Sequence, residues 1–274
     1  MQEKVRALVV TGFGINCEEE MAAAYRLAGA EADIVHLSAI FTQRVSIHDY
    51  QILNFPGGFS FGDDLGSARV LANKFKFKQM TSGKRFIDEI ERFLNKGRFI
   101  MGVCNGFQAL VKMGLLPNVG GNFEQEVTLT GNDSGQFEDR WVSCAVQARN
   151  ASPFLKGISN IDLPVRHGEG KLLIRDEAVQ QAIIEKNLNV LTYADEQGRP
   201  TSEYPFNPNG SQLNCAGLID GSGQVFGLMP HPEAYLSLYN HPDWGRLKLT
   251  DAPADETGQG LKVFVNIVQH IKES

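Results

Sequence analysis

Short apolar runs alternate with amphipathic stretches along the first half of the chain. Runs of strand length, bounded by turn residues, predict buried strands at Arg6–Thr11, Ala32–Leu37, Gln51–Phe55 and Phe99–Met101. Apolar residues at helical spacing predict helices at Glu18–Ala28, residues 83–96 and Phe107–Val111. Because alternating strands and helices form parallel sheets with right-handed crossovers, the pattern predicts an α/β fold: an open, mostly parallel, twisted sheet flanked by helices.

The pattern changes after residue 120, where turn-rich links separate further strands. Strands are predicted at Trp141–Val146, Gln212–Ile219 and Val225–Met229, and helices at residues 176–186 and 259–271. The chain shows no internal repeat and no convincing linker. We therefore expect a single domain over residues 1–274, with an additional β-rich portion after residue 120.

Composition narrows the class of protein. The chain has 274 residues, of which 42% are hydrophobic and 21% charged, as is usual for a globular protein with a core of its own. The net charge of −6 and the lack of a dense Lys/Arg stripe argue against nucleic-acid binding. In the one basic cluster, Lys74–Lys78, lysine alternates with phenylalanine. This pattern favours a solvated face with apolar anchors over a phosphate or partner contact.

Neither membrane insertion nor secretion is indicated. No apolar run reaches the roughly 18 residues that span a bilayer, and Met1–Arg6 lacks the long apolar segment of a signal peptide. The cysteines at positions 17, 104, 144 and 215 form no CxxC pair and no metal-ligand spacing. We therefore expect a cytoplasmic protein with free thiols and without a metal site.

The segment Gly102–Gly106 carries the clearest chemical signal. It lies between a predicted strand and a predicted helix and places Cys104 at the sharp turn, as in the nucleophile elbow of hydrolases. Flanking glycines remove Cβ atoms that would clash in such a turn. The helix that follows points its N–H groups at the sulfur, which favours thiolate over thiol. Cys104 is therefore the predicted nucleophile.

A thiolate nucleophile needs a general base and a group that orients the base. His231 follows the apolar strand Val225–Met229 and stands between two prolines, which are expected to hold the backbone extended. Side chains two residues apart in an extended chain point the same way, so Glu233 is expected to orient His231. Cys104, His231 and Glu233 form the predicted catalytic triad.

Backbone N–H groups at the same sheet edge are candidates for an oxyanion hole. Asn105 directly follows the nucleophile, and Gly58 lies in the loop after the strand Gln51–Phe55. Glycine at position 58 allows the backbone to approach a substrate closely and to adopt positive φ.

The remaining reactive residues are predicted to have mainly structural roles. Cys17 is interpreted as a small residue beside Asn16, the expected helix N-cap, and Cys144 and Cys215 as core residues. The segment His167–Gly170 is interpreted as a mobile loop, with a substrate or partner surface as the alternative. Asp63 and Asp64 are expected to be solvated rather than to bind a cation.

These motifs together resemble a known family. Pro56–Gly58, Gly102–Gln108 and Met229–Glu233 look like the corresponding segments of class I (triad) glutamine amidotransferases. More narrowly, Gly57–Asp63, His167–Gly170 and Tyr204–Ser211 are similar to the glutaminase part of phosphoribosylformylglycinamidine synthase, an enzyme of purine biosynthesis. The resemblance runs from near residue 5 to the closing helix and implies the flavodoxin-like fold of that family.

The resemblance also implies roles, substrate and partners. Cys104 is expected to attack the side-chain amide of glutamine, His231 to shuttle the proton and Glu233 to orient it, with Gly58 and Asn105 forming the oxyanion hole. The implied substrate-binding residues are Gly57, Gln108, Asn132 and Ser134.

The resemblance further implies that ammonia passes to a separate synthase subunit, which binds ATP and Mg²⁺, and that a small accessory subunit is a further partner. No cofactor is expected in this chain. A stand-alone cysteine γ-glutamyl hydrolase or peptidase of similar fold is the alternative function. The two differ in whether the released ammonia is coupled to a synthesis.

Overall fold

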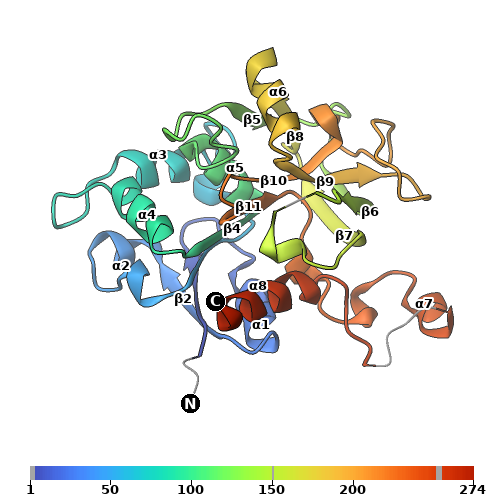
Figure 1. The fold of residues 1–274 in the computed structure, drawn as a ribbon, viewed down its shortest axis with the longest axis horizontal. Coiled ribbons are helices and arrows are strands. Elements are labelled where there is room, and N and C mark those ends of the chain that lie inside the picture. Colours follow the sequence, from blue (N-terminus) through green and yellow to red (C-terminus); the bar gives the residue numbers. More distant parts are fainter. Residues whose placement is uncertain (1–3, 150, 251–254) are drawn as a thin grey trace.

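One half of the large central sheet is parallel (Figure 1). The computed structural model describes residues 4–149, 151–250 and 255–274, so Met1–Glu3 of the N-terminal segment lie outside it. Five parallel strands lie side by side, in the order β2 (Glu31–His36), β1 (Arg6–Thr11), β3 (Ile52–Phe55), β4 (Phe99–Val103) and β11 (Val225–Leu228). Their carboxyl ends therefore share one edge of the sheet, where sites form in such folds.

Helices cover both faces of the parallel half (Figure 1). On one face, α1 (Glu18–Leu27) lies beside α8 (Leu261–Glu273), with the rings of Tyr25 and Phe264 edge to face at 5.0 Å. The other face carries α3 (Arg69–Phe77), α4 (Phe86–Asn95) and α5 (Asn105–Met113). Two short helices, α2 (Leu37–Phe41) and α7 (Trp244–Thr250), lie outside these layers. The predicted α/β fold is confirmed.

The β-rich portion predicted after residue 120 continues the same sheet. Four antiparallel strands extend it beyond β11, in the order β10 (Cys215–Ile219), β9 (Asn189–Ala194), β6 (Glu138–Val146) and β7 (Asn160–His167). A separate two-stranded ribbon joins β5 (Val127–Thr130) to β8 (Lys171–Ile174), next to α6 (Glu177–Glu185).

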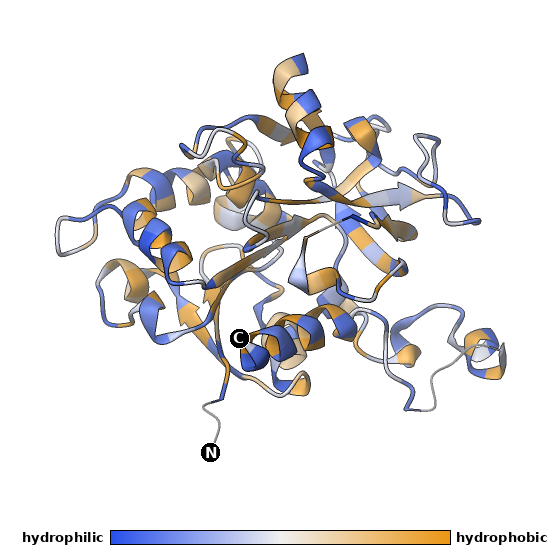
Figure 2. Ribbon diagram, viewed as in Figure 1, coloured by the Kyte–Doolittle hydropathy of each residue, from blue (hydrophilic) through white to orange (hydrophobic). Residues whose placement is uncertain are grey.

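Burial follows the hydropathy of the sequence. Every residue of β3, β4, β10 and β11 is buried, and these strands are largely apolar in Figure 2, whereas the outer helices carry apolar and polar stripes. Continuous apolar runs are typical of strands covered on both faces. The same burial explains why these strands appear in the sequence as short apolar runs.

The basic cluster Lys74–Lys78 lies at the end of helix α3, which includes residues 74–77. Phe75 is buried there, as an apolar anchor would be, whereas Phe77 is 63% exposed. One strand prediction needs correction in detail. The strand predicted at Gln212–Ile219 begins only at Cys215, because Gln212–Asn214 form a 3-10 turn in which Leu213 has a φ of 53°.

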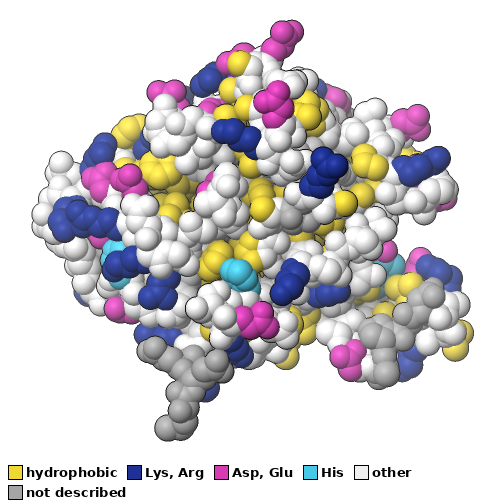
Figure 3. All heavy atoms as spheres, in the orientation of Figure 1, with side chains coloured by type: hydrophobic (Ala, Val, Ile, Leu, Met, Phe, Trp, Pro, Cys, Tyr) yellow, Lys and Arg dark blue, Asp and Glu magenta, His cyan; other side chains and the backbone are white. Residues whose placement is uncertain are grey.

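Charge is mixed on the face shown in Figure 3. Lys and Arg side chains lie among Asp and Glu side chains there, without a large patch of one sign. In the part of the chain that the structure describes, no helix combines the length and apolar character needed to cross a membrane.

Candidate active site

Cys104 stands at the turn between β4 and α5, as predicted. Its backbone dihedrals, φ 51° and ψ −107°, lie outside the regions that non-glycine residues ordinarily adopt. Such a strained turn at the end of a buried strand is the geometry of a nucleophile elbow. The turn is held from the neighbouring strand, because the Cys104 N–H donates to Leu228 O at 2.8 Å.

Gly106 permits the close approach of α5 to the sheet. A Cβ atom at this position would lie 1.8 Å from the carbonyl oxygen of Phe55 in β3, a distance that no side chain tolerates. Gly106, two residues after the nucleophile, is therefore required by the packing of α5 against β3. It fixes where the helix starts relative to Cys104.

His231 and Glu233 form a buried pair next to the elbow. Each residue is only 2% exposed, and His231 Nδ1 lies 2.6 Å from Glu233 Oε1. The His231 N–H donates to Pro164 O of β7 at 2.8 Å. The predicted contact is present, but the predicted reason is wrong: Pro232–Ala234 form a 3-10 turn rather than extended chain. Proline has a φ compatible with the first position of a helix, so Pro232 starts this turn.

The electrostatic surroundings of His231 favour its protonated form. Burial alone would lower its pKa, but the carboxylate of Glu233, followed by the thiols of Cys104 and Cys17, raises the pKa of His231 well above the ordinary value. The Sγ of Cys104 contacts Arg166 O at 3.6 Å, and Nε2 of His231 is buried without a hydrogen-bond partner among the described residues. The ring is thus arranged to receive a proton on the side that faces the site.

The loop after β3 brings Gly58 to the same edge. Gly58 has a φ of +142°, and a Cβ atom there would lie 2.5 Å from Gly14 O, so only glycine fits. Gly58 pairs with Ile15 in an isolated bridge whose hydrogen bonds use Gly57 O and Phe59 N. The N–H of Gly58 lies outside these bonds. Asn105 opens helix α5, where the first N–H groups have no intrahelical acceptor.

The side chain of Asn105 links the two candidate oxyanion segments. Its Oδ1 accepts from Ser60 N at 3.2 Å, and its Nδ2 donates to Asp63 Oδ2 at 3.1 Å and to Gln108 Oε1 at 3.0 Å. Asp63 is thus engaged by protein groups rather than freely solvated as expected; burial raises its pKa, while its hydrogen bonds to Ala68 and Asn105 oppose that rise.

Gln108 lies one helical turn after Cys104 and is 3% exposed. Its Nε2 donates to Glu169 O at 2.6 Å, which ties α5 to the segment that follows β7. The Glu169 carboxylate in turn accepts from Ser67 N at 3.3 Å. The segment His167–Gly170 therefore borders the site. The sequence had left open whether this segment is a mobile loop or part of a substrate or partner surface.

Asn132 holds this bordering segment in place. The side chain is buried; Nδ2 donates to His167 O at 2.8 Å and Oδ1 accepts from Gly170 N at 2.9 Å. His167 itself ends β7 and is 2% exposed, so the segment is anchored rather than loose. Ser134, by contrast, is exposed, and its hydroxyl accepts from Gln136 N at 3.3 Å. Whether Asn132 and Ser134 contact a substrate stays a prediction.

Cys17 is the residue that sequence reasoning misplaced. Cys17, not Asn16, is the N-cap of α1, and its Sγ lies beside Gly57 and the imidazole of His231. Burial raises the pKa of the Cys17 thiol. The β1 loop carries no motif that announces this proximity; only the parallel pairing of β1 with β3 produces it. Cys144 and Cys215 are buried in strands, as predicted.

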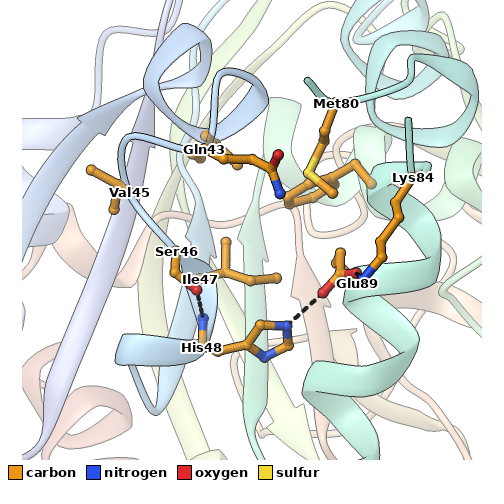
Figure 4. A pocket seen from close by; sticks show the side chains of 10 residues that line it. Gln43, Val45, Ser46, Ile47, His48, Met80, Lys84 and Glu89 are labelled. Carbon is orange, nitrogen blue, oxygen red and sulfur yellow. Dashed lines mark hydrogen bonds and ion pairs between the residues drawn. The ribbon is translucent and has the colours of Figure 1, made fainter. Parts of the chain in front are cut away.

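A second histidine–glutamate pair lies outside this site. His48 Nε2 is 2.8 Å from Glu89 Oε2 at the wall of a cavity of about 230 Å³, where the imidazole points toward helix α4 (Figure 4). No cysteine lines this cavity. The pair offers a natural comparison for His231 and Glu233.

A family model for the CobB/CobQ-like glutamine amidotransferase domain matches residues 4–271. The chain belongs to this family. The match extends over both halves of the sheet, and it confirms the resemblance drawn from the elbow, the glycine loop and the Met229–Glu233 segment.

Named relatives of this chain belong to one particular group of amidotransferases. The chain is 42% identical over 273 residues to the phosphoribosylformylglycinamidine synthase subunit PurQ of Dehalococcoides mccartyi, covering 98% of this chain and 99% of that protein. It is 36% identical over 275 residues to the same subunit of Methanococcus maripaludis, covering 98% of each.

A solved structure agrees with this assignment. A chain in the structure of PurLQS from Thermotoga maritima matches with a TM-score of 0.70 and 30% sequence identity, covering 98% of this chain and 100% of that one. This amidotransferase therefore shares its fold with the matching chain of that structure.

Proposed function

We propose that this amidotransferase is the glutaminase subunit of a phosphoribosylformylglycinamidine synthase. It hydrolyses glutamine to glutamate and ammonia and passes the ammonia to a synthase subunit in purine biosynthesis. Relatives named as this subunit, aligned over nearly their whole length, support the assignment and disfavour a stand-alone γ-glutamyl hydrolase or peptidase. The observation that carries the chemistry is the buried His231–Glu233 pair beside the strained Cys104 elbow.

The first half of the reaction forms a thioester. Cys104 transfers its thiol proton to His231, and the sulfur attacks the side-chain carbonyl carbon of glutamine. Negative charge on the carbonyl oxygen is stabilised by the N–H groups of Gly58 and Asn105. His231 then donates its proton to the leaving nitrogen, the C–N bond breaks, and ammonia departs. The raised pKa of His231 supports this role, because it stabilises the imidazolium while the thiolate forms.

The second half restores the enzyme. His231 takes a proton from water, which attacks the γ-glutamyl thioester; the C–S bond breaks, glutamate leaves, and the sulfur regains its proton. Glu233 keeps the imidazole oriented throughout, through the contact at Nδ1. Gly57, Gln108, Asn132 and Ser134 are proposed to border the bound glutamine, with Gln108 acting through its position at the first turn of α5.

The partners follow from this chemistry. We propose that the synthase subunit binds ATP and Mg²⁺, that a small accessory subunit joins the complex, and that the assembly works in the cytoplasm. This chain then contributes the ammonia and no cofactor of its own.

The deciding experiment separates ammonia production from ammonia use. In complex with the synthase subunit of the same organism, Cys104→Ala is expected to abolish glutamine-dependent amidine synthesis while synthesis from added ammonium salt continues. Loss of both activities would contradict the division of labour. A glutamine-like electrophile should label Cys104 in the wild type, as peptide mass spectrometry can locate; labelling at Cys17 instead would contradict the assigned nucleophile.

A further inference from the structure

A second thiol stands beside the imidazole of the proposed general base. Among the described residues, Cys17, His231 and Glu233 each offer one ligand atom, and these sulfur, nitrogen and oxygen atoms lie within 4.8 Å of one another. The proposed reaction uses His231 and Glu233 but leaves Cys17 without a part. The cluster therefore has a capacity that glutamine hydrolysis does not explain.

One member of the cluster has a polar atom that the proposed reaction does not use. Oε2 of Glu233 is buried and has no hydrogen-bond partner among the described residues, whereas Nε2 of His231, which is also unpaired, is the atom proposed to receive the proton of Cys104. The side chains of His231 and Glu233 are 3% and 1% exposed. Buried polar atoms are ordinarily paired, and each unpaired one calls for an explanation such as an absent ligand or ion. Cys17 is only partly buried, so the cluster is reachable from solvent.

The backbone fixes the thiol in this place. The N–H groups of Asn16 and Cys17 both donate to Gly57 O, at 3.2 and 3.3 Å. A Cβ atom at Gly57 would lie 2.8 Å from Cε1 of His231 and 3.1 Å from Sγ of Cys17, so the missing side chain leaves room for both. The thiol, on the loop after β1, and the imidazole, on the segment after β11, thus meet beside Gly57 of the loop after β3.

We propose that Cys17, His231 and Glu233 bind Zn²⁺ and that the bound ion inhibits ammonia production. Thiolate, imidazole and carboxylate are the ligands that zinc takes in proteins, whereas Mg²⁺ and Ca²⁺ prefer oxygen alone. Binding displaces to solvent the thiol proton of Cys17 and one proton of the protonated His231 imidazole, and it forms Zn–S, Zn–N and Zn–O bonds. At zinc bond lengths, tetrahedral neighbours lie about 3.3–3.8 Å apart, so the contact of 2.6 Å between His231 and Glu233 opens to admit the ion, while ligand atoms that lie farther apart move closer.

Inhibition follows from the ligand that the ion shares with catalysis. A His231 ring held by zinc cannot receive the proton of Cys104, so thioester formation stops. This consequence rests on the proposed glutaminase function, whereas the binding site itself does not.

Binding is tested with Co²⁺, whose charge-transfer band reports a thiolate ligand. The full-length Cys104→Ala chain removes the nucleophile, and Cys144 and Cys215 are buried in strands, so a band reports Cys17. We expect saturable Co²⁺ binding with this band, displaced by Zn²⁺. Adding Cys17→Ser should abolish the band and weaken Zn²⁺ binding by about 100-fold or more, since losing even an outer-shell partner costs 10–100-fold.

A matched control uses the other histidine–glutamate pair. His48→Gln removes an imidazole that also contacts a glutamate but has no cysteine beside it (Figure 4), and it should leave Zn²⁺ affinity unchanged. Near-ultraviolet circular dichroism checks the fold of each variant, and Cys17→Ala replaces Cys17→Ser if the latter is misfolded. A band that persists without Cys17, or no saturable binding in the Cys104→Ala chain, would overturn the proposed site.

Inhibition is tested in the complex with the synthase subunit. Zn²⁺ should suppress glutamine-dependent synthesis and spare synthesis from ammonia. Cys17→Ser should raise the half-inhibitory Zn²⁺ concentration, when the rates of each protein are normalised to its own uninhibited rate. An unchanged half-inhibitory concentration would overturn the inhibitory role. Cys17-dependent Co²⁺ binding in a chain without glutamine-dependent activity would instead show that the proposed function had failed and the site had not.

Discussion

The two halves of the sheet contribute different kinds of groups to the site. The parallel half supplies side chains at strand ends: Cys104 after β4 and His231 after β11. The antiparallel half contributes main-chain carbonyls: Pro164 O accepts from His231 N, and Arg166 O contacts Cys104 Sγ. Beyond β7, Glu169 O accepts from Gln108 Nε2. Reactive side chains thus stand on one half and are positioned by the backbone of the other.

The difference has a physical basis. Parallel strands end at a common edge, so the loops that follow them lie close together. Strand β7 of the antiparallel half instead borders the site with residues inside the strand, and it offers main-chain carbonyl groups, which every residue type has. Substitutions of the reactive side chains of the parallel half should therefore act on the reaction, and substitutions in the antiparallel half should act on positioning and stability.

The sharpest test of the parallel half is His231→Asn. Asparagine cannot serve as the general base, so glutamine-dependent synthesis should fall by about 10²–10⁴-fold. Steady-state rates in the complex with the synthase subunit give the measurement, and synthesis from ammonia should be unaffected. A glutamine-dependent rate near that of the wild type would remove His231 from the proposed mechanism.

Gly106→Ala tests the close helix–strand approach in the parallel half. The added Cβ would lie 1.8 Å from the backbone of Phe55, so the free energy of unfolding should fall by more than about 3 kcal/mol. Gly131→Ala is the matched control, because a Cβ there meets nothing within 4 Å, and it should change stability by less than about 0.5 kcal/mol. Urea unfolding measures both; equal effects would argue against the packing role of Gly106.

Asn132→Ala tests the positioning role of the antiparallel half. The substitution leaves His167 O and Gly170 N without their buried partner, so about 2–3 kcal/mol of stability should be lost. Ser134→Ala, at an exposed neighbour, should leave stability unchanged and raise the KM for glutamine if Ser134 contacts the substrate. Unfolding curves and steady-state kinetics separate the two; an unchanged KM would remove Ser134 from the substrate site.

The smallest expected effect is a pH dependence at the end of β7. Burial, and then the charge of His231, lower the pKa of His167 to about 3. Because the unfolded chain binds this proton near pH 6.5, the contribution to stability is present above that pH and is lost as the pH falls toward 3. Between pH 7 and 5 the wild type should lose about 2 kcal/mol more than His167→Gln.

Urea unfolding at the two pH values measures this difference. The comparison isolates His167, because the other titrating groups are the same in both proteins. Parallel losses in the wild type and the variant would show that His167 is not held neutral by its burial.

Much of the parallel half could be read from the sequence, for local reasons. Strands such as Arg6–Thr11 and Phe99–Val103 are short apolar runs, and Cys104 is marked by glycines on both sides. The antiparallel half was harder. Strand β7, for example, contains Pro164 and polar residues on its outer face, and its pairing with β6 depends on contacts far away in the chain. Continuous burial on both faces gives a stronger pattern than burial on one.

The sequence by itself determined the α/β class, the nucleophile elbow and the presence of a histidine and a glutamate two residues apart. These features are local, because each depends on residue types within a few positions. Tertiary structure decided that Glu233 reaches His231 through a 3-10 turn, that Gln108 is bound to Glu169 O, and that Cys17 lies beside the imidazole. Each of these depends on which strands are neighbours, and strand order is set by the packing of the whole sheet.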